Sequence, residues 1–172
     1  MRENDTPRIY VACLAAYNAG QLHGCWIDAT REIEEIWANI HALIVSSPVE
    51  GAEEFAIHDY EGFGPLCLSE FEGVERVHDL ACFIEEHGDI GAATLDHFGG
   101  DLEDAETAME NYCGCFESLA DYAQDLTEQT SDVPRHLACY IDYTAMARDM
   151  EMSGDVFTVQ TVWNEVHVFW AH

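Results

Sequence analysis

The sequence predicts an α+β fold in three consecutive parts, with a small sheet and a helix at each end and packed helices in the middle. Short apolar runs with strand-like alternation lie near both ends of the 172-residue chain, whereas apolar residues in the middle recur at helical spacing. The hydrophobic fraction of 48% is normal for a globular protein. The expected domains are an N-terminal α+β domain (1–62), a middle acidic helical domain (63–108) and a C-terminal α+β domain with a hairpin (109–172).

The N-terminal domain is expected to hold three strands and one helix. The strands are the runs 9–16, 22–28 and 54–60, and a turn at 17–20 separates the first two. Thr30 is placed as the N-cap of the helix, whose apolar positions recur every three or four residues. Pro48 ends this helix, because proline cannot continue it.

Three helices are expected in the middle domain and just beyond it. The first contains Val74 to Ile84 and stops at Gly88. Asp89 is placed as the cap of a second, shorter helix that ends at Gly99 and Gly100. The third, at 101–110, is very acidic.

The C-terminal domain is expected to begin with an extended link, followed by an acidic helix. The expected elements are the link at 111–116, the helix at 117–132, a strand at 137–141, a helix at 143–152 capped by Asp142, and strands at 156–162 and 166–170. The residues at 163–165 predict a hairpin between the last two strands.

The charge is strongly one-sided. The chain has 34 acidic residues and six arginines but no lysine, and its net charge is −28. Between Glu50 and Asp132 lie 23 of the acids, with Arg76 as the only basic residue. Such a surface repels nucleic acid and anionic membranes and attracts basic protein surfaces, so neither nucleic acid nor membrane is an expected partner.

The acidic helix at 117–132 shows the bias most clearly. Its apolar residues form one stripe, and the opposite stripe carries carboxylates three or four residues apart, which repel one another. We predict that this charge is presented to a partner. The candidate partner-binding acids are Asp101, Glu103, Asp104, Glu106, Glu110, Glu117, Asp121, Asp125, Glu128 and Asp132. Adaptation to high salt is an alternative source of acidity, although it should spread acids evenly along the chain.

No enzyme motif accompanies the charge. The absence of lysine excludes a P-loop and a Schiff-base lysine, so no catalytic residue and no cofactor are predicted. The sequence shows no signal peptide and no membrane-spanning run, and its seven cysteines are an odd number, so we expect reduced thiols in the cytoplasm.

Three weak metal candidates lack the spacing of a dedicated site, and no metal is predicted. They are His78 with Cys82 and His87, the pair Cys113 and Cys115, and the segment 101–104. The last would begin a calcium loop, but Glu106 stands at the sixth position, where the turn glycine belongs. His58 is interpreted as a structural strand residue rather than a base.

The amount of charge is comparable with that of a short DNA duplex. Duplex DNA carries one charge per about 1.7 Å, so a net charge of −28 corresponds to about 48 Å, or about 14 base pairs. A rigid folded carrier would bind a phosphate-binding groove better than a flexible polyanion, whose ordering costs entropy.

Several segments of the chain resemble one known family. They are 9–20 (IYVACLAAYNAG), 22–28 (LHGCWID), 53–63 (EEFAIHDYEGF), 118–122 (SLADY), 140–143 (YIDY) and 166–170 (VHVFW). They are similar to the ArdA family of antirestriction proteins. The resemblance implies a DNA mimic, an elongated homodimer of three small domains per chain, which occupies the DNA-binding groove in the methyltransferase and specificity core of type I restriction-modification enzymes. The family has no catalytic residues to carry over.

Two other functions stay open. A different DNA-mimic target, such as a basic nucleoid protein or a repressor, would be indicated by loss of restriction inhibition with nucleoid-protein binding retained. A metal-dependent enzyme would need a stoichiometric metal and turnover without a partner.

The homodimer interface is placed in the C-terminal hairpin. Between Val156 and Trp170 the only acid is Glu165, so two copies would not repel each other there. A terminal hairpin also offers a strand edge that needs covering. The expected interface residues are Phe157, Val159, Trp163, Val168 and Phe169.

Overall fold

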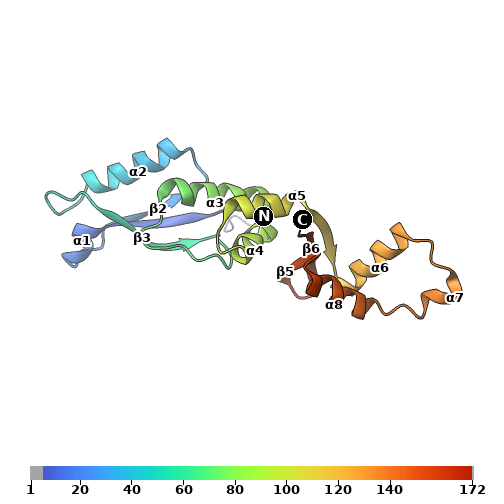
Figure 1. Ribbon diagram of the computed structural model, residues 1–172. Coiled ribbons are helices and arrows are strands. Elements are labelled where there is room, and N and C mark those ends of the chain that lie inside the picture. Colours follow the sequence, from blue (N-terminus) through green and yellow to red (C-terminus); the bar gives the residue numbers. More distant parts are fainter. Residues whose placement is uncertain (1–5, 172) are drawn as a thin grey trace. The chain divides into compact units, whose positions relative to one another are not determined.

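The computed structural model describes residues 6–171, which form a mixed α+β structure with eight helices and two three-stranded antiparallel sheets (Figure 1). The chain divides into two compact units, residues 1–92 and 93–172, each with one of the sheets. The α+β class is therefore confirmed, whereas the three-domain division and the elongated shape stay predictions. Within residues 6–171, no helix is both long and apolar enough to cross a membrane.

The sheet of the first unit has the order β2-β1-β3. Its central strand β1 (Arg8–Cys13) pairs antiparallel with β2 (Gly24–Asp28) and with β3 (Phe55–Glu61). Ile9, Val11 and Cys13 are buried, as expected for alternate positions of a strand covered on one face. The three strands confirm those predicted at 9–16, 22–28 and 54–60, apart from their ends.

The first strand ends earlier than predicted, at Cys13, and the next five residues form the short helix α1 (Leu14–Asn18). The prediction of a strand to residue 16 and a turn from 17 was therefore wrong. Leucine and alanine at 14–16 favour a helix as much as an apolar strand, and Ala16 is buried in this conformation.

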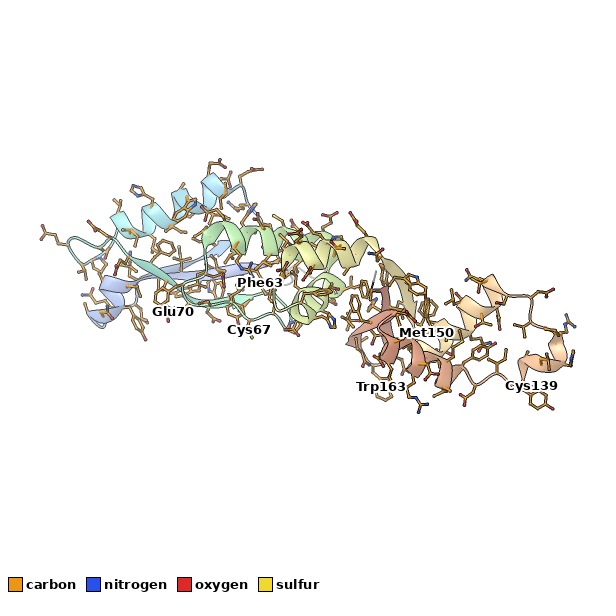
Figure 2. The ribbon with its side chains drawn as sticks, viewed as in Figure 1. Phe63, Cys67, Glu70, Cys139, Met150 and Trp163 are labelled. Atoms are coloured by element: carbon orange, nitrogen blue, oxygen red, sulfur yellow. The ribbon has the colours of Figure 1, made fainter. Side chains whose placement is uncertain are left out.

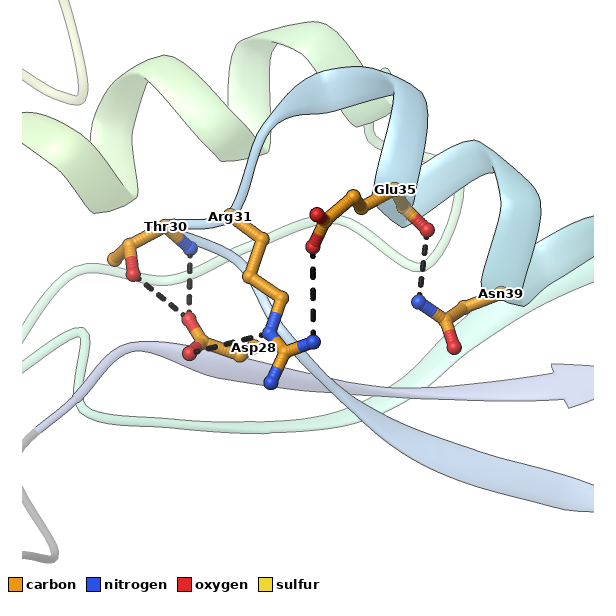
Figure 3. A network of polar contacts seen from close by, with 5 residues as sticks. All are labelled: Asp28, Thr30, Arg31, Glu35 and Asn39. Atoms are coloured by element: carbon orange, nitrogen blue, oxygen red, sulfur yellow. Dashed lines mark hydrogen bonds and ion pairs between the residues drawn. The ribbon is translucent and has the colours of Figure 1, made fainter.

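The helix α2 (Ile33–Val45) covers this sheet with Ile36, Ile40 and Leu43. Thr30 is not its N-cap, contrary to the prediction, because the helix begins three residues later and its N-cap is Glu32. The backbone N–H and the hydroxyl of Thr30 instead both donate to the Asp28 carboxylate, at 3.0 and 2.8 Å (Figure 3).

Two further helices follow β3. The helix α3 (Val74–His87) ends at Gly88, as predicted, and Gly88 has a φ of 66° that favours glycine. The helix α4 (Asp89–His97) starts immediately afterwards, so Asp89 is its first residue and not the predicted cap. Because Gly88 is the only residue between the two helices, no separate capping position is left for Asp89.

The sheet of the second unit has the order β4-β6-β5. The strands β5 (Val156–Val162) and β6 (Glu165–Trp170) form the predicted hairpin, whose turn contains Asn164 at a φ of 63°. The segment predicted as a link is a third strand, β4 (Tyr112–Phe116), which pairs with β6. Its partner is about fifty residues away in sequence, so local pattern could not reveal the pairing.

Three helices lie between β4 and β5 in this unit. The helices α6 (Leu119–Thr130) and α8 (Tyr143–Ser153) pack against each other, and Asp142 caps α8 as predicted by accepting from the Ala145 N–H at 2.9 Å. Their shared core includes Tyr122, Ala123 and Met150, the last of which is labelled in Figure 2.

The prediction of a strand at 137–141 was wrong. This segment contains the one-turn helix α7 (Arg135–Ala138), which Pro134 begins by accepting from two backbone N–H groups. Its apolar residues Leu137 and Tyr140 are exposed and pair with no strand. The apolar pattern therefore marks an exposed loop segment here and not part of a sheet.

Candidate functional site

The helix α5 (Leu102–Glu110) presents most of its carboxylates to solvent. Asp101 is its N-cap and accepts a hydrogen bond from the Asp104 N–H at 3.2 Å. Ala105 and Ala108 are buried, so the helix rests on small side chains. The exposed acids of α5 with its cap are Asp101, Glu103, Asp104, Glu106 and Glu110. Those in the first turn are favoured by the helix dipole, whereas Glu106 and Glu110 gain nothing from it.

The helix α6 presents a second row of carboxylates. The Ser118 hydroxyl caps it by accepting from the Asp121 N–H at 3.3 Å. Tyr122 and Ala123 are buried against the core of the unit, and burial raises the pKa of the Tyr122 phenol, which therefore adds no charge. The exposed acids of this helix are Asp121, Asp125 and Glu128.

Two of the predicted partner-binding acids lie outside the helix on which they were expected. Glu117 precedes the Ser118 cap, and Asp132 follows Ser131, whose extended backbone ends α6. Both side chains are exposed. The like-charged row on α6 therefore has three members, and the predicted helix at 117–132 is two residues too long at each end.

Glutamine side chains bind two of the carboxylates of α6. Gln124 Nε2 donates to Glu128 Oε1 at 2.8 Å, and Gln129 Nε2 donates to Asp125 Oδ2 at 2.6 Å. An amide donor satisfies a carboxylate oxygen and restricts its rotamers, but it leaves the negative charge in place. Sequence reasoning missed these residues, although glutamine four residues from an acid on a helix was a visible signal.

None of these helix acids is neutralised by a cation. We use the term α5–α6 acids for Glu103, Asp104, Glu106, Glu110, Asp121, Asp125 and Glu128. In the described part of the chain, none of them has a basic nitrogen within 4.0 Å. Arg135 and Arg148, the arginines of the second unit, are exposed and form no ion pair with any residue from 6 to 171.

The arginines of the first unit behave differently. Arg8 pairs with Glu61, Arg76 pairs with Glu72 at 3.1 Å, and Arg31 lies 3.8 Å from Asp28 and 3.7 Å from Glu35. Each of these cations therefore neutralises acids of its own unit.

The residues expected at a dimer interface fall into two groups. Val159, Val168 and Phe169 are buried within their own unit, and Phe157 is half-buried in a stack against Phe169 at a ring-centroid distance of 4.9 Å. Trp163 is 84% exposed at the hairpin turn, where Figure 2 labels it. Val162 and Trp170 are exposed as well. The exposed apolar area of the hairpin thus comes from residues that were mostly not in the predicted set.

The weak metal candidates do not assemble into larger groups. His78 Nε2 lies 3.5 Å from Cys82 Sγ, while His87 packs against the Phe83 ring instead. No group of three His, Cys, Asp or Glu side chains among residues 6–171 is arranged to hold a metal ion. All seven cysteines are free thiols.

Comparison with known families gives a match over most of the chain. A family model described as "Antirestriction protein (ArdA)" matches residues 9–165. The search of curated proteins found no match for this chain. The matched segment includes α5, α6 and all of the α5–α6 acids.

Proposed function

The chain belongs to the ArdA family of antirestriction proteins, and from this premise we propose that it inhibits a type I restriction-modification enzyme by mimicking DNA. The acids would occupy the groove that binds DNA in the methyltransferase and specificity core. The observation that carries the proposal is the exposure of the α5–α6 acids without a neutralising cation.

The physical basis of the mimicry is charge fixed on a folded support. Acids three or four residues apart on a helix lie about 5–6 Å apart at their Cβ atoms, a spacing that a groove lined by Lys and Arg can meet with several contacts at once. Because α5 already buries Ala105 and Ala108 and α6 already buries Tyr122 and Ala123, binding the two helices costs little ordering entropy.

The glutamine contacts on α6 support the same interpretation. A helix that only had to be stable would gain from Lys or Arg four residues from each acid. Gln124 and Gln129 occupy such positions and supply a hydrogen bond instead of a charge. The helix therefore keeps its full negative field toward solvent.

We also propose that the protein acts as a homodimer joined through the C-terminal hairpin, with Trp163 as the central contact. Charge equivalent to about 14 base pairs is short for an enzyme that reads a two-part site, and a two-fold axis would double it. The exposed Trp163 offers apolar area in a region poor in acids. Changing Trp163 to Glu should convert the dimer to a folded monomer in sedimentation equilibrium, and a variant that stays dimeric would move the interface elsewhere.

The decisive experiment for the function is a competition assay. A purified type I methyltransferase is bound to a fluorescent duplex that contains its recognition site, and the protein is added in increasing amounts. We expect stoichiometric displacement of the duplex. Failure to displace it, together with tight binding to a basic nucleoid protein, would reject the type I target in favour of the second one.

A further inference from the structure

A pocket in the first unit combines aromatic rings with one carboxylate. It has a volume of about 420 Å³, and its lining residues are Tyr17, Ile57, His58, Tyr60, Leu68 and Glu70. It lies outside the α5–α6 acids, which belong to the second unit. The volume falls within the range of pockets that bind small ligands or single side chains.

A β-bulge directs His58 into this pocket. In the pairing of β1 with β3, Tyr10 is opposite Asp59 and Val11 is opposite Ile57, so His58 is an extra residue with no partner on β1. Bulges of this kind change the direction of a side chain at the edge of a sheet. The His58 and Tyr17 rings pack edge to face at a centroid distance of 4.6 Å and an interplanar angle of 79°.

The other two walls are fixed by buried structure. The Tyr60 ring packs at 88° against Phe63, which is buried. The backbone carbonyl of Glu70 accepts the Ile57 N–H at 2.9 Å, which holds the segment containing Glu70 beside β3 (Figure 2). The pocket is therefore present before any ligand arrives.

The carboxylate of Glu70 has no permanent counter-ion. Glu70 Oε1 lies 3.5 Å from His58 Nε2, and no arginine in the described part of the chain pairs with it. The Glu70 side chain is 52% exposed, so a second cation can reach it from solvent. The pocket thus offers a negative charge next to aromatic faces, with no positive group other than a protonated His58.

We propose that this pocket binds the guanidinium or ammonium group of a basic side chain on the protein partner. Glu70 would accept charge-assisted hydrogen bonds from the cation, and the Tyr17 and Tyr60 rings would contact it through their electron-rich faces. Leu68 and Ile57 would contact the aliphatic stem of an Arg or Lys side chain. An anionic ligand is disfavoured by Glu70 and by the net charge of the chain.

The claim that the bound cation belongs to a side chain of the target enzyme rests on the proposed function. The claim that the pocket binds such a cation does not. Broad electrostatic attraction between the α5–α6 acids and a basic groove does not select one side chain. A pocket that accepts a single Arg or Lys would fix the position of the first unit on the enzyme. The two statements can therefore be tested separately.

The pocket chemistry is tested with small probes and no target enzyme. N-acetyl-arginine amide is titrated into the protein while the ring-proton NMR signals of Tyr17 and His58 are followed, and N-acetyl-citrulline amide is the neutral isostere. We expect saturable shifts with the arginine probe alone, and about tenfold weaker binding in E70Q. The matched control is E53Q, which removes one exposed charge outside the pocket. Equal binding of both probes, equal affinity in E70Q and E53Q, or no saturation would overturn the proposal.

A second variant tests the contact between the cation and the Tyr17 ring and keeps the proposal testable if E70Q does not fold. Tyr17 is 55% exposed, so Y17L should fold normally, weaken the arginine probe about threefold and leave the amide spectrum elsewhere unchanged. Y17F keeps the ring and should bind as the wild type does. A Y17L protein that binds the probe with unchanged affinity would remove Tyr17 from the site and contradict the aromatic part of the proposal.

Whether the bound cation belongs to the partner enzyme is tested with the methyltransferase. In the duplex-displacement assay, E70Q should lose several-fold more affinity than E53Q. Equal small losses in the two variants, with probe binding confirmed, would assign the pocket to a free cationic ligand and overturn the partner side chain as its source. If the wild-type protein fails to displace the duplex but still binds the arginine probe, the proposed function fails and the pocket chemistry stands.

Discussion

Two helices of this protein deal with their acids in opposite ways. At the start of α2, Arg31 lies between Asp28 and Glu35, at 3.8 and 3.7 Å from their carboxylates (Figure 3). On α6 the carboxylates of Asp125 and Glu128 accept hydrogen bonds from glutamine amides and meet no cation. Both arrangements use partners on the chain's own surface, but only the first removes charge.

The difference shows that a surface carboxylate can be hydrogen-bonded by its neighbours without having its charge neutralised. Exposed ion pairs add only a few tenths of a kcal/mol up to about 1 kcal/mol, so α6 loses little stability by having none. What it keeps is an electric field toward solvent. Asp28 and Glu35 beside Arg31 stabilise the local structure, whereas the acids of α6 stay available to the partner in the proposed function.

The largest effect on binding affinity is expected when three charges are removed from α6, compared with three removed from the first unit. Replacing Asp121, Asp125 and Glu128 by Asn, Asn and Gln should weaken methyltransferase binding about tenfold, because three contacts to basic side chains are lost. The control replaces Glu35, Glu61 and Glu72 by Gln, which removes the same charge from paired acids. It should weaken binding by less than about threefold. Equal losses of affinity in the duplex-displacement assay would show that only the net charge matters for binding. That result would favour adaptation to high salt as the origin of the acidic residues.

The salt dependence of binding should separate the same two variants. Logarithmic affinity is expected to fall steeply with logarithmic salt concentration in the wild-type protein, since a basic groove releases its counter-ions. The α6 variant, which lacks three charges, should have a slope shallower by about two to three units. The control variant should keep the wild-type slope. A flat wild-type profile between low and moderate salt would instead indicate an apolar contact.

Changing Gln129 to Arg would make α6 resemble α2. The new guanidinium lies four residues after Asp125, the favourable order for an ion pair on a helix, and should raise the free energy of unfolding by about 0.3–0.5 kcal/mol. Affinity for the methyltransferase should fall about threefold through the added positive charge. Urea denaturation and the displacement assay measure the two quantities. A stabilised variant with undiminished affinity would show that the charge of Asp125 is not used.

The smallest effect is expected from changing Arg31 to Gln. Its two ion pairs are exposed, so the free energy of unfolding should fall by less than about 1 kcal/mol. Affinity for the methyltransferase should stay within twofold of the wild-type value. A loss of several kcal/mol in urea denaturation would show that the start of α2 depends on this arginine far more than exposed pairs usually allow.

Local sequence signals located the long helices but only one of their three predicted caps. Apolar residues at helical spacing placed α2 and α3, and Asp142 was correctly identified as the cap of α8, whereas Thr30 and Asp89 were not caps. The wrong strand and link predictions share a cause. Short helices such as α1 and α7 contain too few residues for periodicity to separate them from strands, and β4 depends on a partner far along the chain.

The candidate site was predictable in composition but not in detail. Exposed acids on α5 and α6 follow from the alternation of charged and apolar positions, as Glu106 and Asp121 illustrate. The glutamine contacts and the position of Glu70 beside His58 depend on side-chain geometry, which spacing does not specify. Burial of Val168 and Phe169 within their own sheet could not be distinguished from an interface by hydrophobicity alone.

The small buried faces of α5 have an evolutionary consequence. Ala105 and Ala108 are the fully buried residues of the helix, so its exposed positions can exchange Asp for Glu without disturbing the core. If the proposed function holds, the target enzyme has no comparable freedom. Substitutions that make its groove reject a row of carboxylates would also weaken its binding to DNA phosphates, so selection for resistance to the inhibitor would work against selection for restriction.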